Sequence, residues 1–549
     1  ITAKSEGINL SGISNIDSFT NSGLISADNR AIFASTSGSN NLTIKNLSNS
    51  KTGTINGKVA IENNGNFTGT IAVNTFENKG QINGQIYMGI WGNNSGALSI
   101  DKFDNSGTIT TSNGQGVFFE GRNTNIKTFN NNNNGLISGS EGVKMVSGTI
   151  ENFTNNGTIK GDSAAVFIQN SIIKTLENKG TINSTGDIHW GGAIKLENGG
   201  TIENIINTGT INSATSAIVV SYGKFGTLTI KDGGVVYGKN AGITVGQWQT
   251  LGDLYIDGTS SNDKVSGIYS DNHGIALGVG SSTSKIELKN GGIIQGNVNG
   301  IRLEQAASLS GEIILSGKGS RVEGGSGAGI SNGSGKIEGS IKVEDGATVT
   351  SSSGQAISNS GSGSITGGIT ISGENTKLEG NIVNTGNASI GSDIKIEDGA
   401  KVEGGLVNQG NGSISGSVQV SGGSSIDSIT NEGSGSISGN IVVESGGKLD
   451  SITNTSTSDT GISGSITNNS DNKLKISNSG NIGGKIESTG SADMMISNSN
   501  GGTISGGISS SGSGSTSISN SQGSTINNGI TVSGSAQVEI SNQGSVGKD

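Results

Sequence analysis

The chain has 549 residues, of which 30% are hydrophobic and only 3% aromatic, and it contains 97 Gly, no Pro and no Cys. The net charge of -10 is spread thinly, and the lack of any basic patch with interleaved aromatic residues argues against nucleic-acid binding. The lack of Cys excludes a disulfide framework, and no apolar run is long enough to span a membrane as a helix. Ile and Val nevertheless recur at alternating positions, which indicates a folded chain rather than a disordered polar one.

The first 210 residues repeat one phrase, seen as FTNSGLIS at 19, FENKGQIN at 76, FDNSGTIT at 103 and LENKGTIN at 176. The copies share a Gly that recurs every 22 to 30 residues: Gly23, Gly53, Gly80, Gly107, Gly135, Gly157, Gly180 and Gly209. Each Gly is followed two residues later by an Ile: Ile25, Ile55, Ile82, Ile109, Ile137, Ile159, Ile182 and Ile211. Repetition of this kind indicates a structural unit rather than a catalytic motif.

The spacing within the phrase predicts a strand, a bend and a second strand. The apolar residues lie an even number of positions apart and therefore share one face of an extended chain. Seven copies have Asn two residues before the Gly, namely Asn21, Asn78, Asn105, Asn133, Asn155, Asn178 and Asn207, and Lys51 is the exception. We expect the Asn and Gly to provide the left-handed backbone of the bend, and the stacked Asn residues to share amide hydrogen bonds.

Between the phrases lie further apolar alternations, such as GQGVFFE at 114, GGAIKL at 191 and ATSAIVV at 214. Each unit thus holds about three short strands and three turns, which is typical of one coil of a parallel β-helix. The variable period favours the right-handed form, because the left-handed form shows strict hexapeptides. We therefore predict an all-β, right-handed parallel β-helix of roughly 21–23 coils with three short strands per coil.

The repeat changes its wording along the chain, which predicts three segments. Residues 1–227 carry the aromatic-containing phrase, residues 228–305 carry variants such as LTIKDGG, and residues 306–549 form a slim Gly/Ser/Ile-rich segment. Ile residues mark the copies of the last segment: Ile313, Ile337, Ile365, Ile390, Ile414, Ile437, Ile462, Ile482, Ile504 and Ile526. All eleven Phe lie between 19 and 225 and the last aromatic residue is Tyr269, so the core beyond it must consist of small aliphatic residues.

The repeated Asn-x-Gly-x-Ile units, the Cys-free chain and the β-helical period resemble the passenger regions of bacterial autotransporters, the type V secretion family. The resemblance covers essentially the whole chain and implies architecture more than activity. It implies secretion across the outer membrane, display at the cell surface or release outside the cell, and a C-terminal β-barrel translocator outside this chain. The related two-partner secreted adhesins also use β-helical rods and are the alternative. The chain starts at Ile1 rather than Met, and we interpret it as a mature chain or a fragment.

Few residues suggest a local site. The tetrapeptide DIHW places Asp187 and His189 on one face of an extended segment, beside Trp190, where they could contact a metal or a sugar. Trp91 and Trp248 are the other Trp residues, and aromatic side chains often anchor sugars and proteins. These five residues are candidate ligand contacts. We expect no catalytic residues, because GDSAA at 161 has neither the complete motif nor the residue order of a serine protease. We also expect no metal site, because Asp187 and His189 are too few ligands, and no cofactor.

The predicted function is that of a surface-displayed stalk or adhesin, whose partner is a host or bacterial surface protein or a glycan. We expect the contacts in the aromatic N-terminal half. The alternative is a polysaccharide-active enzyme built on the same fold, which would need clustered carboxylates and basic residues on one face. A third possibility is a subunit of an extracellular filament or layer, formed by self-association.

Overall fold

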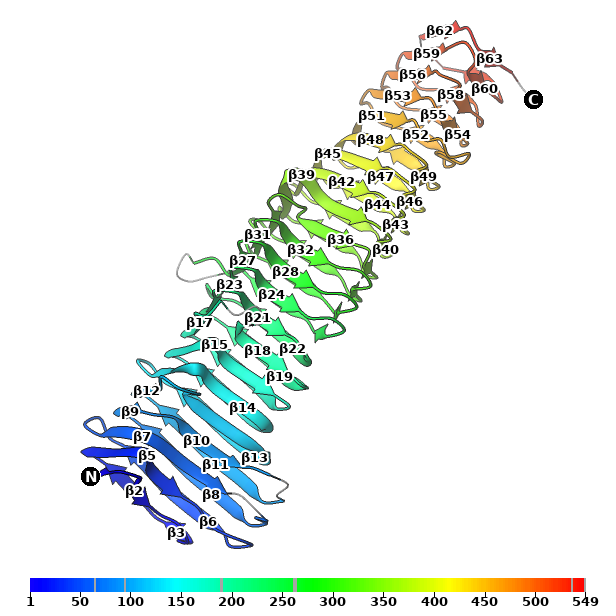
Figure 1. Cartoon of the computed structure of the whole chain (residues 1–549). Coiled ribbons are helices and arrows are strands. Elements are labelled where there is room, and N and C mark those ends of the chain that lie inside the picture. Colours follow the sequence, from blue (N-terminus) through cyan, green and yellow to red (C-terminus); the bar gives the residue numbers. More distant parts are fainter. Residues whose placement is uncertain (64–65, 93–94, 188–190, 260–263, 535–536, 548–549) are drawn as a thin grey trace. The chain divides into compact units, whose positions relative to one another are not determined.

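The computed structural model describes residues 1–63, 66–92, 95–187, 191–259, 264–534 and 537–547. Over these residues the chain is an all-β parallel solenoid of about 20 turns without any helix, which confirms the predicted β-helix (Figure 1). No helix capable of crossing a membrane occurs in the described part of the chain. Contacts divide the chain into two compact units, Ile1–Asp271 and Asn272–Asp549. The parallel pairing joins each strand to the one a coil later.

Unit 1 is built from three ladders of parallel strands, which begin with β1 (Thr2–Ala3) in the first, β2 (Glu6–Asn9) in the second, and β3 (Asn15–Ile16) and β4 (Phe19–Asn21) in the third. The first ladder is formed by β5 (Leu24–Ala34), β7 (Thr54–Asn63), β9 (Gln81–Asn83), β12 (Thr108–Thr110), β14 (Leu136–Asn155), β15 (Thr158–Gln169), β17 (Thr181–Ser184), β20 (Thr210–Ser213), β23 (Val235–Gly238) and β27 (Gly267–Ser270). Its register pairs the repeated isoleucines with one another, from Ile25 with Ile55 to Ile182 with Ile211. These side chains are buried, so the sequence repeat is one coil of the solenoid.

The second ladder contains the apolar alternations between the phrases. It is formed by parts of β5, β7, β14 and β15 together with β10 (Ile86–Ile90), β13 (Val117–Asn131), β18 (Gly192–Glu197), β21 (Ser216–Val220) and β24 (Ala241–Val245). Its inward residues pair in a fixed register, from Met88 with Phe119 to Val220 with Val245. The turn after this ladder carries the candidate site described below.

The third ladder carries the aromatic and asparagine positions of the phrase. It is formed by parts of β13 and β14 together with β6 (Leu42–Asn49), β8 (Thr70–Asn78), β11 (Ala97–Asn105), β16 (Ile172–Asn178), β19 (Gly200–Asn207), β22 (Gly223–Ile230), β25 (Thr250–Leu251) and β26 (Leu254–Asp257). Phe103 stacks on Phe76 with 4.8 Å between ring centroids, and on Phe129 with 4.7 Å. Such pairs contribute roughly 0.5–1.5 kcal/mol beyond the burial of their area.

The asparagines of the third ladder form a continuous row of buried amides. Each Nδ2 group donates to the Oδ1 atom of the next asparagine at 2.7–2.9 Å, through Asn21, Asn49, Asn78, Asn105, Asn131, Asn155, Asn178 and Asn207. The expected asparagine ladder is thus confirmed. One expected position, Asn133, is wrong, and the copy of Lys51, which was expected to lack a ladder asparagine, has one, because the copies around Gly53 and Gly135 contain two extra turn residues. Asn49 and Asn131 occupy the ladder there, whereas Lys51 and Asn133 lie exposed in the turns.

The glycine of the phrase has a different role from the one expected. Neither it nor the ladder asparagine has a positive φ in the described copies. A Cβ atom on Gly180 would instead lie less than 3.0 Å from the backbone carbonyls of Gly157 and Asn156 in the preceding coil. The same collision with the carbonyl of an earlier phrase glycine recurs at Gly80, Gly107, Gly157 and Gly209. Close approach of neighbouring coils, rather than a left-handed bend, therefore requires glycine at this position.

Unit 2 begins with β28 (His273–Leu277), β29 (Ser282–Thr283), β30 (Ile286–Lys289), β31 (Ile293–Gly296), β32 (Asn299–Leu303), β33 (Ser308–Leu309), β34 (Ile313–Ser316) and β35 (Arg321–Gly324). These coils have four short strands each, whereas later coils have the expected three because two strands join. The joined strands form a ladder with β36 (Ile330–Gly333): β39 (Thr348–Ser360), β42 (Lys377–Asn384), β45 (Lys401–Asn408), β48 (Ser425–Asn431), β51 (Lys448–Asn454), β53 (Leu474–Asn478), β56 (Met494–Asn498), β59 (Thr516–Asn520) and β62 (Val538–Asn542).

The marker isoleucines of unit 2 form a second ladder with Leu309. Its strands are β37 (Lys336–Ile337), β40 (Ser364–Ile365), β43 (Ser389–Ile390), β46 (Ser413–Ile414), β49 (Ser436–Ile437), β54 (Asn481–Ile482), β57 (Thr503–Ile504), β60 (Thr525–Ile526) and β63 (Ser545–Val546). Ile462 continues it between Ile437 and Ile482. Ile313 was wrongly expected in this row, since Leu309 pairs with Ile337 while Ile313 pairs with Ile341.

Ile313 belongs to the remaining ladder of unit 2, which joins β30 and β34 to later strands. These are β38 (Ile341–Glu344), β41 (Ile369–Ser372), β44 (Ile394–Glu397), β47 (Val418–Val420), β50 (Ile441–Val443), β52 (Ile466–Asn468), β55 (Ile486–Ser488), β58 (Ile508–Ser510) and β61 (Ile530–Val532). The core between the ladders is aliphatic, as expected for this half of the sequence.

Unit 2 has its own asparagine ladder, which the sequence analysis missed. Each Nδ2 again donates to the next Oδ1 at 2.8–3.0 Å, through Asn332, Asn359, Asn384, Asn408, Asn431, Asn454, Asn478, Asn498, Asn520 and Asn542. The Oδ1 atom of Asn332 is buried without a hydrogen-bond partner among the described residues. This first rung lacks a donor because the paired position one coil earlier is Leu303.

Candidate functional site

The most exposed aromatic side chains of the described residues all lie in the turn that follows the second ladder of unit 1. Trp91 is 48% exposed, Tyr222 is 66% exposed and Trp248 is 71% exposed. Trp91 and Trp248 each lie three residues after the paired positions Met88 and Val245, and Tyr222 lies two residues after its counterpart Val220. We name this row of three residues the aromatic edge.

Trp248 is held in an unusual backbone conformation. Its φ is 61°, a left-handed value that costs energy for a bulky residue. The turn is closed by the Gln249 N–H, which donates to the carbonyl of Gly246 at 3.2 Å, and by Gln249 Nε2, which donates to the carbonyl of Gln247 at 2.9 Å. Earlier coils have Ser147, Asn170 and Asn198 as the left-handed residues of this turn. A tryptophan thus occupies a place where other coils use small residues, including glycines such as Gly199.

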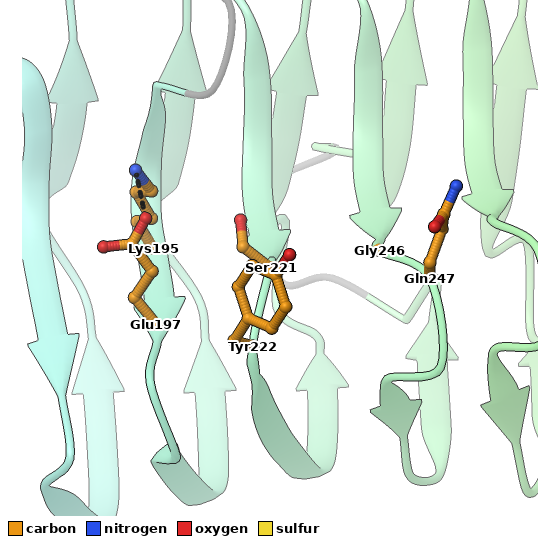
Figure 2. A pocket seen from close by; sticks show the side chains of 6 residues that line it. All are labelled: Lys195, Glu197, Ser221, Tyr222, Gly246 and Gln247. Carbon is orange, nitrogen blue, oxygen red and sulfur yellow. Dashed lines mark ion pairs between the residues drawn. The ribbon is translucent and has the colours of Figure 1, made fainter.

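A groove of about 470 Å³ lies beside Tyr222 and crosses three successive coils. It is lined by Lys195, Glu197, Ser221, Tyr222, Gly246 and Gln247, and Figure 2 shows Tyr222 between the Lys195–Glu197 pair and Gln247. The residues come from the ends of β18, β21 and β24, which the second ladder holds in register. The turn after β21 is fixed to its neighbour because the Gly223 N–H donates to Gln249 Oε1 at 2.8 Å.

The charges of the groove neutralise each other. Lys195 Nζ lies 3.0 Å from Glu197 Oε1, and Lys195 also lies 5.4 Å from the ring centroid of Phe167. In the described structure the Tyr222 hydroxyl and the Gln247 side-chain amide have no hydrogen-bond partner, and the buried Ser221 hydroxyl also has none. Glu197 is the one carboxylate among the described lining residues. A glycoside hydrolase of the common type requires two, roughly 5–10 Å apart.

The strand face that precedes this edge is also aromatic and cationic, but its groups satisfy one another. Lys58 lies 4.1 Å from the ring centroid of Tyr87, and the Tyr87 hydroxyl donates to Glu120 at 2.8 Å. Burial, followed by the contact with Glu120, raises the pKa of Tyr87, so the phenol stays protonated. Lys144 lies 5.0 Å from the Phe167 ring and 3.9 Å from Glu141. These contacts stabilise the sheet face.

The expected contact residues are not brought together. Trp91 and Trp248 follow the same ladder, but six coils separate them, which is about 29 Å at 4.8 Å per coil. Asp187 is exposed after β17, in a turn that precedes the second ladder rather than following it. His189 and Trp190 lie outside the described residues. No group of three His, Cys, Asp or Glu side chains that could hold a metal occurs in the described part of the chain.

Tyr222 is the residue that the sequence analysis missed. It follows the apolar run AIVV in the sequence SYG, at a position where other coils have no aromatic residue. Ser163, in the GDSAA segment, lies in β15 and donates its hydroxyl to the Ser140 carbonyl at 3.1 Å. No protein-family model matches the chain, and no curated protein or solved structure is significantly similar to it. The class of the protein is given by its fold alone, which is an all-β parallel solenoid.

One buried titratable group lies in the first coils of unit 2. His273 is 8% exposed, with Nε2 2.9 Å from Arg302 Nη1 and Nδ1 3.3 Å from Asn299 Nδ2. Because arginine can only donate, Nε2 must accept, and the ring is neutral. Burial and then the Arg302 charge lower the pKa of His273 from 6.5 to about 4.

We expect the stability of unit 2 to fall on acidification. The folded pKa of His273 lies below the unfolded value, so the unfolded chain binds more protons between about pH 6.5 and pH 4. The stability is fully present above pH 6.5 and is lost as the pH falls towards 4, by about 2 kcal/mol after allowance for the partly solvated ring. Urea midpoints at pH 7.5 and 4.5 measure the effect. His273→Gln should reduce the pH dependence of the urea midpoint, and an unchanged pH dependence in that variant would contradict this role of His273. His189→Gln is the control and should leave the pH dependence of the midpoint as it is in the unchanged chain.

Proposed function

We propose that the chain is a surface-displayed adhesive stalk that contacts its partner through the aromatic edge of unit 1. The observation that carries this proposal is the position of Trp91, Tyr222 and Trp248, which are exposed and follow one ladder. Large rigid aromatic side chains give much contact area at little entropic cost, and they are frequent anchors of binding surfaces. The solenoid supplies the rigid backbone that keeps these anchors in a fixed register.

The setting of this function is part of the proposal. The resemblance to autotransporter passengers supports secretion across the outer membrane through a barrel outside this chain, followed by display at the cell surface. The partner is a protein or a glycan of a host or bacterial surface. Stacked coils joined by backbone and asparagine hydrogen bonds suit a position outside the cell, where no disulfide is needed to hold this Cys-free chain.

Removing the aromatic edge should abolish attachment without unfolding the chain. Beads coated with the purified chain are applied to epithelial monolayers and to bacterial cells, and the attached beads are counted. We expect the triple variant Trp91→Ser, Tyr222→Ser and Trp248→Gly to reduce attachment at least tenfold, because all three side chains are exposed and Gly suits the left-handed position.

The matched control removes exposed apolar side chains at other corners of unit 1. Ile1→Ser, Leu24→Ser and Val265→Ser change residues that are 44–63% exposed and lie at or just before strands of the first ladder, away from the aromatic edge. This variant should attach like the unchanged chain. If both triple variants attach as well as the unchanged chain, the aromatic edge is not the contact surface. If the unchanged chain attaches to neither cell type, the adhesive function is refuted.

A further inference from the structure

The groove beside Tyr222 combines an exposed aromatic ring with free polar groups at its walls. The phenol of Tyr222 is 66% exposed, and its hydroxyl and the amide of Gln247 have no partner in the described structure. Trp248 follows Gln247 directly in the same hydrogen-bonded turn. An aromatic face bordered by a hydroxyl and an amide fits a ligand that has an apolar face and a polar edge.

We infer that this groove is a subsite for an uncharged pyranose ring of a glycan chain. A sugar ring presents C–H bonds on one face, which pack on an aromatic ring, and hydroxyls along its edge, which both donate and accept hydrogen bonds. Lys195 Nζ and Glu197 Oε1, 3.0 Å apart, offer one donor and one acceptor side by side, as two neighbouring hydroxyls require. The inference rests on the proposed adhesive function, because it names the chemistry of the partner.

The charge balance of the groove decides against an acidic sugar. Lys195 is the only cation among the described lining residues, and it is already paired with Glu197. A uronate or sulfated ring would have to displace Glu197 and leave that carboxylate, which is 29% exposed, beside a second negative charge. A neutral ring can instead bond to both members of the pair without breaking it. The same surface therefore selects neutral over acidic rings.

Fluorescence of Trp248 can test this inference in the full chain. Trp91→Phe and Trp190→Phe leave Trp248 as the sole tryptophan reporter. The probes are cellotetraose, maltotetraose, chitotetraose and lacto-N-tetraose as neutral oligosaccharides, and tetragalacturonate as the acidic one. We expect saturable binding of at least one neutral probe and no saturation with tetragalacturonate. Absence of saturation with every neutral probe, or tighter binding of tetragalacturonate, would overturn the inference.

Variants of the groove locate the binding. Tyr222→Ala should lower the affinity for the neutral probe at least tenfold, because it removes the aromatic face. Tyr222→Phe keeps the ring and should lower the affinity less. Glu197→Gln frees Lys195 and should allow tetragalacturonate to bind. Tyr237→Ala is the matched control, because Tyr237 lies in the first ladder and its hydroxyl is bonded to Asp271 at 3.0 Å. Equal affinities of Tyr222→Ala and Tyr237→Ala would refute the site.

The result of the oligosaccharide-binding experiment can be distinguished from the result of the attachment assay. If the chain attaches to cells but binds no neutral oligosaccharide, the adhesive function stands and the sugar subsite is wrong. If the chain binds a neutral oligosaccharide through Tyr222 but attaches to no cell, the subsite stands and the adhesive function is wrong. Circular dichroism of each variant checks that the β-structure is retained, so that a loss of binding reports on the groove.

Discussion

Asn408→Ala is expected to lower the free energy of unfolding of its region by about 3 kcal/mol. Asn408 is fully buried, and its Nδ2 donates to Asn431 Oδ1 at 2.8 Å and to the Gly412 carbonyl at 3.0 Å. Its Oδ1 accepts from Asn384 Nδ2 at 2.8 Å. The substitution leaves the buried Asn431 Oδ1 without a donor, at a cost of about 1–3 kcal/mol, and it opens a small cavity. It also removes the 2.8 Å acceptor of Asn384 Nδ2, which keeps only the carbonyls of Ala388 and Ser413 at 3.2 Å.

Hydrogen exchange resolved along the chain measures this prediction, because a solenoid opens coil by coil rather than as a single body. Faster exchange should appear in the coils around β42, β45 and β48 and fade with distance. Asn411→Ala is the control: Asn411 also donates to an asparagine, Asn387, at 2.9 Å, but this pair is solvent-exposed. We expect it to cost about 0.5 kcal/mol. Similar exchange rates in both variants would mean that burial of the asparagine ladder contributes nothing to the stability of these coils.

Gly180→Ala is expected to destabilise unit 1 by about 3 kcal/mol, although it adds a single methyl group. The new Cβ would lie within 3.0 Å of the Gly157 carbonyl oxygen and of the Asn156 carbonyl, and backbone atoms cannot move aside as a flexible side chain can. The coils would have to separate locally, which would lengthen the ladder hydrogen bonds around Asn178. Thermal unfolding and proteolytic cleavage between 150 and 210 should both report the loss.

The chain contains a matched control for this effect. Gly23 occupies the same position of the first phrase, but no atom lies within 4 Å of its Cβ position. Gly23→Ala should leave the unfolding temperature within about 2 °C of the unchanged chain. If both substitutions destabilised the chain equally, the glycine would be required by the bend itself, as the sequence alone suggested, and not by the neighbouring coil.

The repeat predicted the fold because the alternation of Ile and Val shows directly which side chains face inward. The register of Ile159 with Ile182 and the ladder from Asn155 to Asn178 both follow from counting along the chain. Counting failed where turns change length, as with Asn133, which was expected in place of Asn131. It also failed in unit 2, where asparagine and marker isoleucine are mostly six residues apart, as between Asn384 and Ile390, rather than four.

The candidate site was less predictable than the fold. Sequence reasoning selected Trp91 and Trp248 as rare aromatic residues, but it could not show that they follow the same ladder six coils apart. It missed Tyr222 because the exposure of a residue next to an apolar run depends on where the strand ends. The groove joins β18, β21 and β24, whose paired residues are more than 20 positions apart along the chain. Only the stacking of coils places them side by side.

The asparagine ladder of unit 2 has a consequence for the evolution of chain length. Its rungs are chemically identical, so the amide of Asn384 would bond to Asn431 as well as it bonds to Asn408 if the coil between them were lost. The same holds for a coil that is duplicated, because its asparagine would find a donor on one side and an acceptor on the other. Genetic slippage by one coil would therefore conserve the asparagine ladder, and selection could adjust the number of coils in unit 2 in steps of about 4.8 Å.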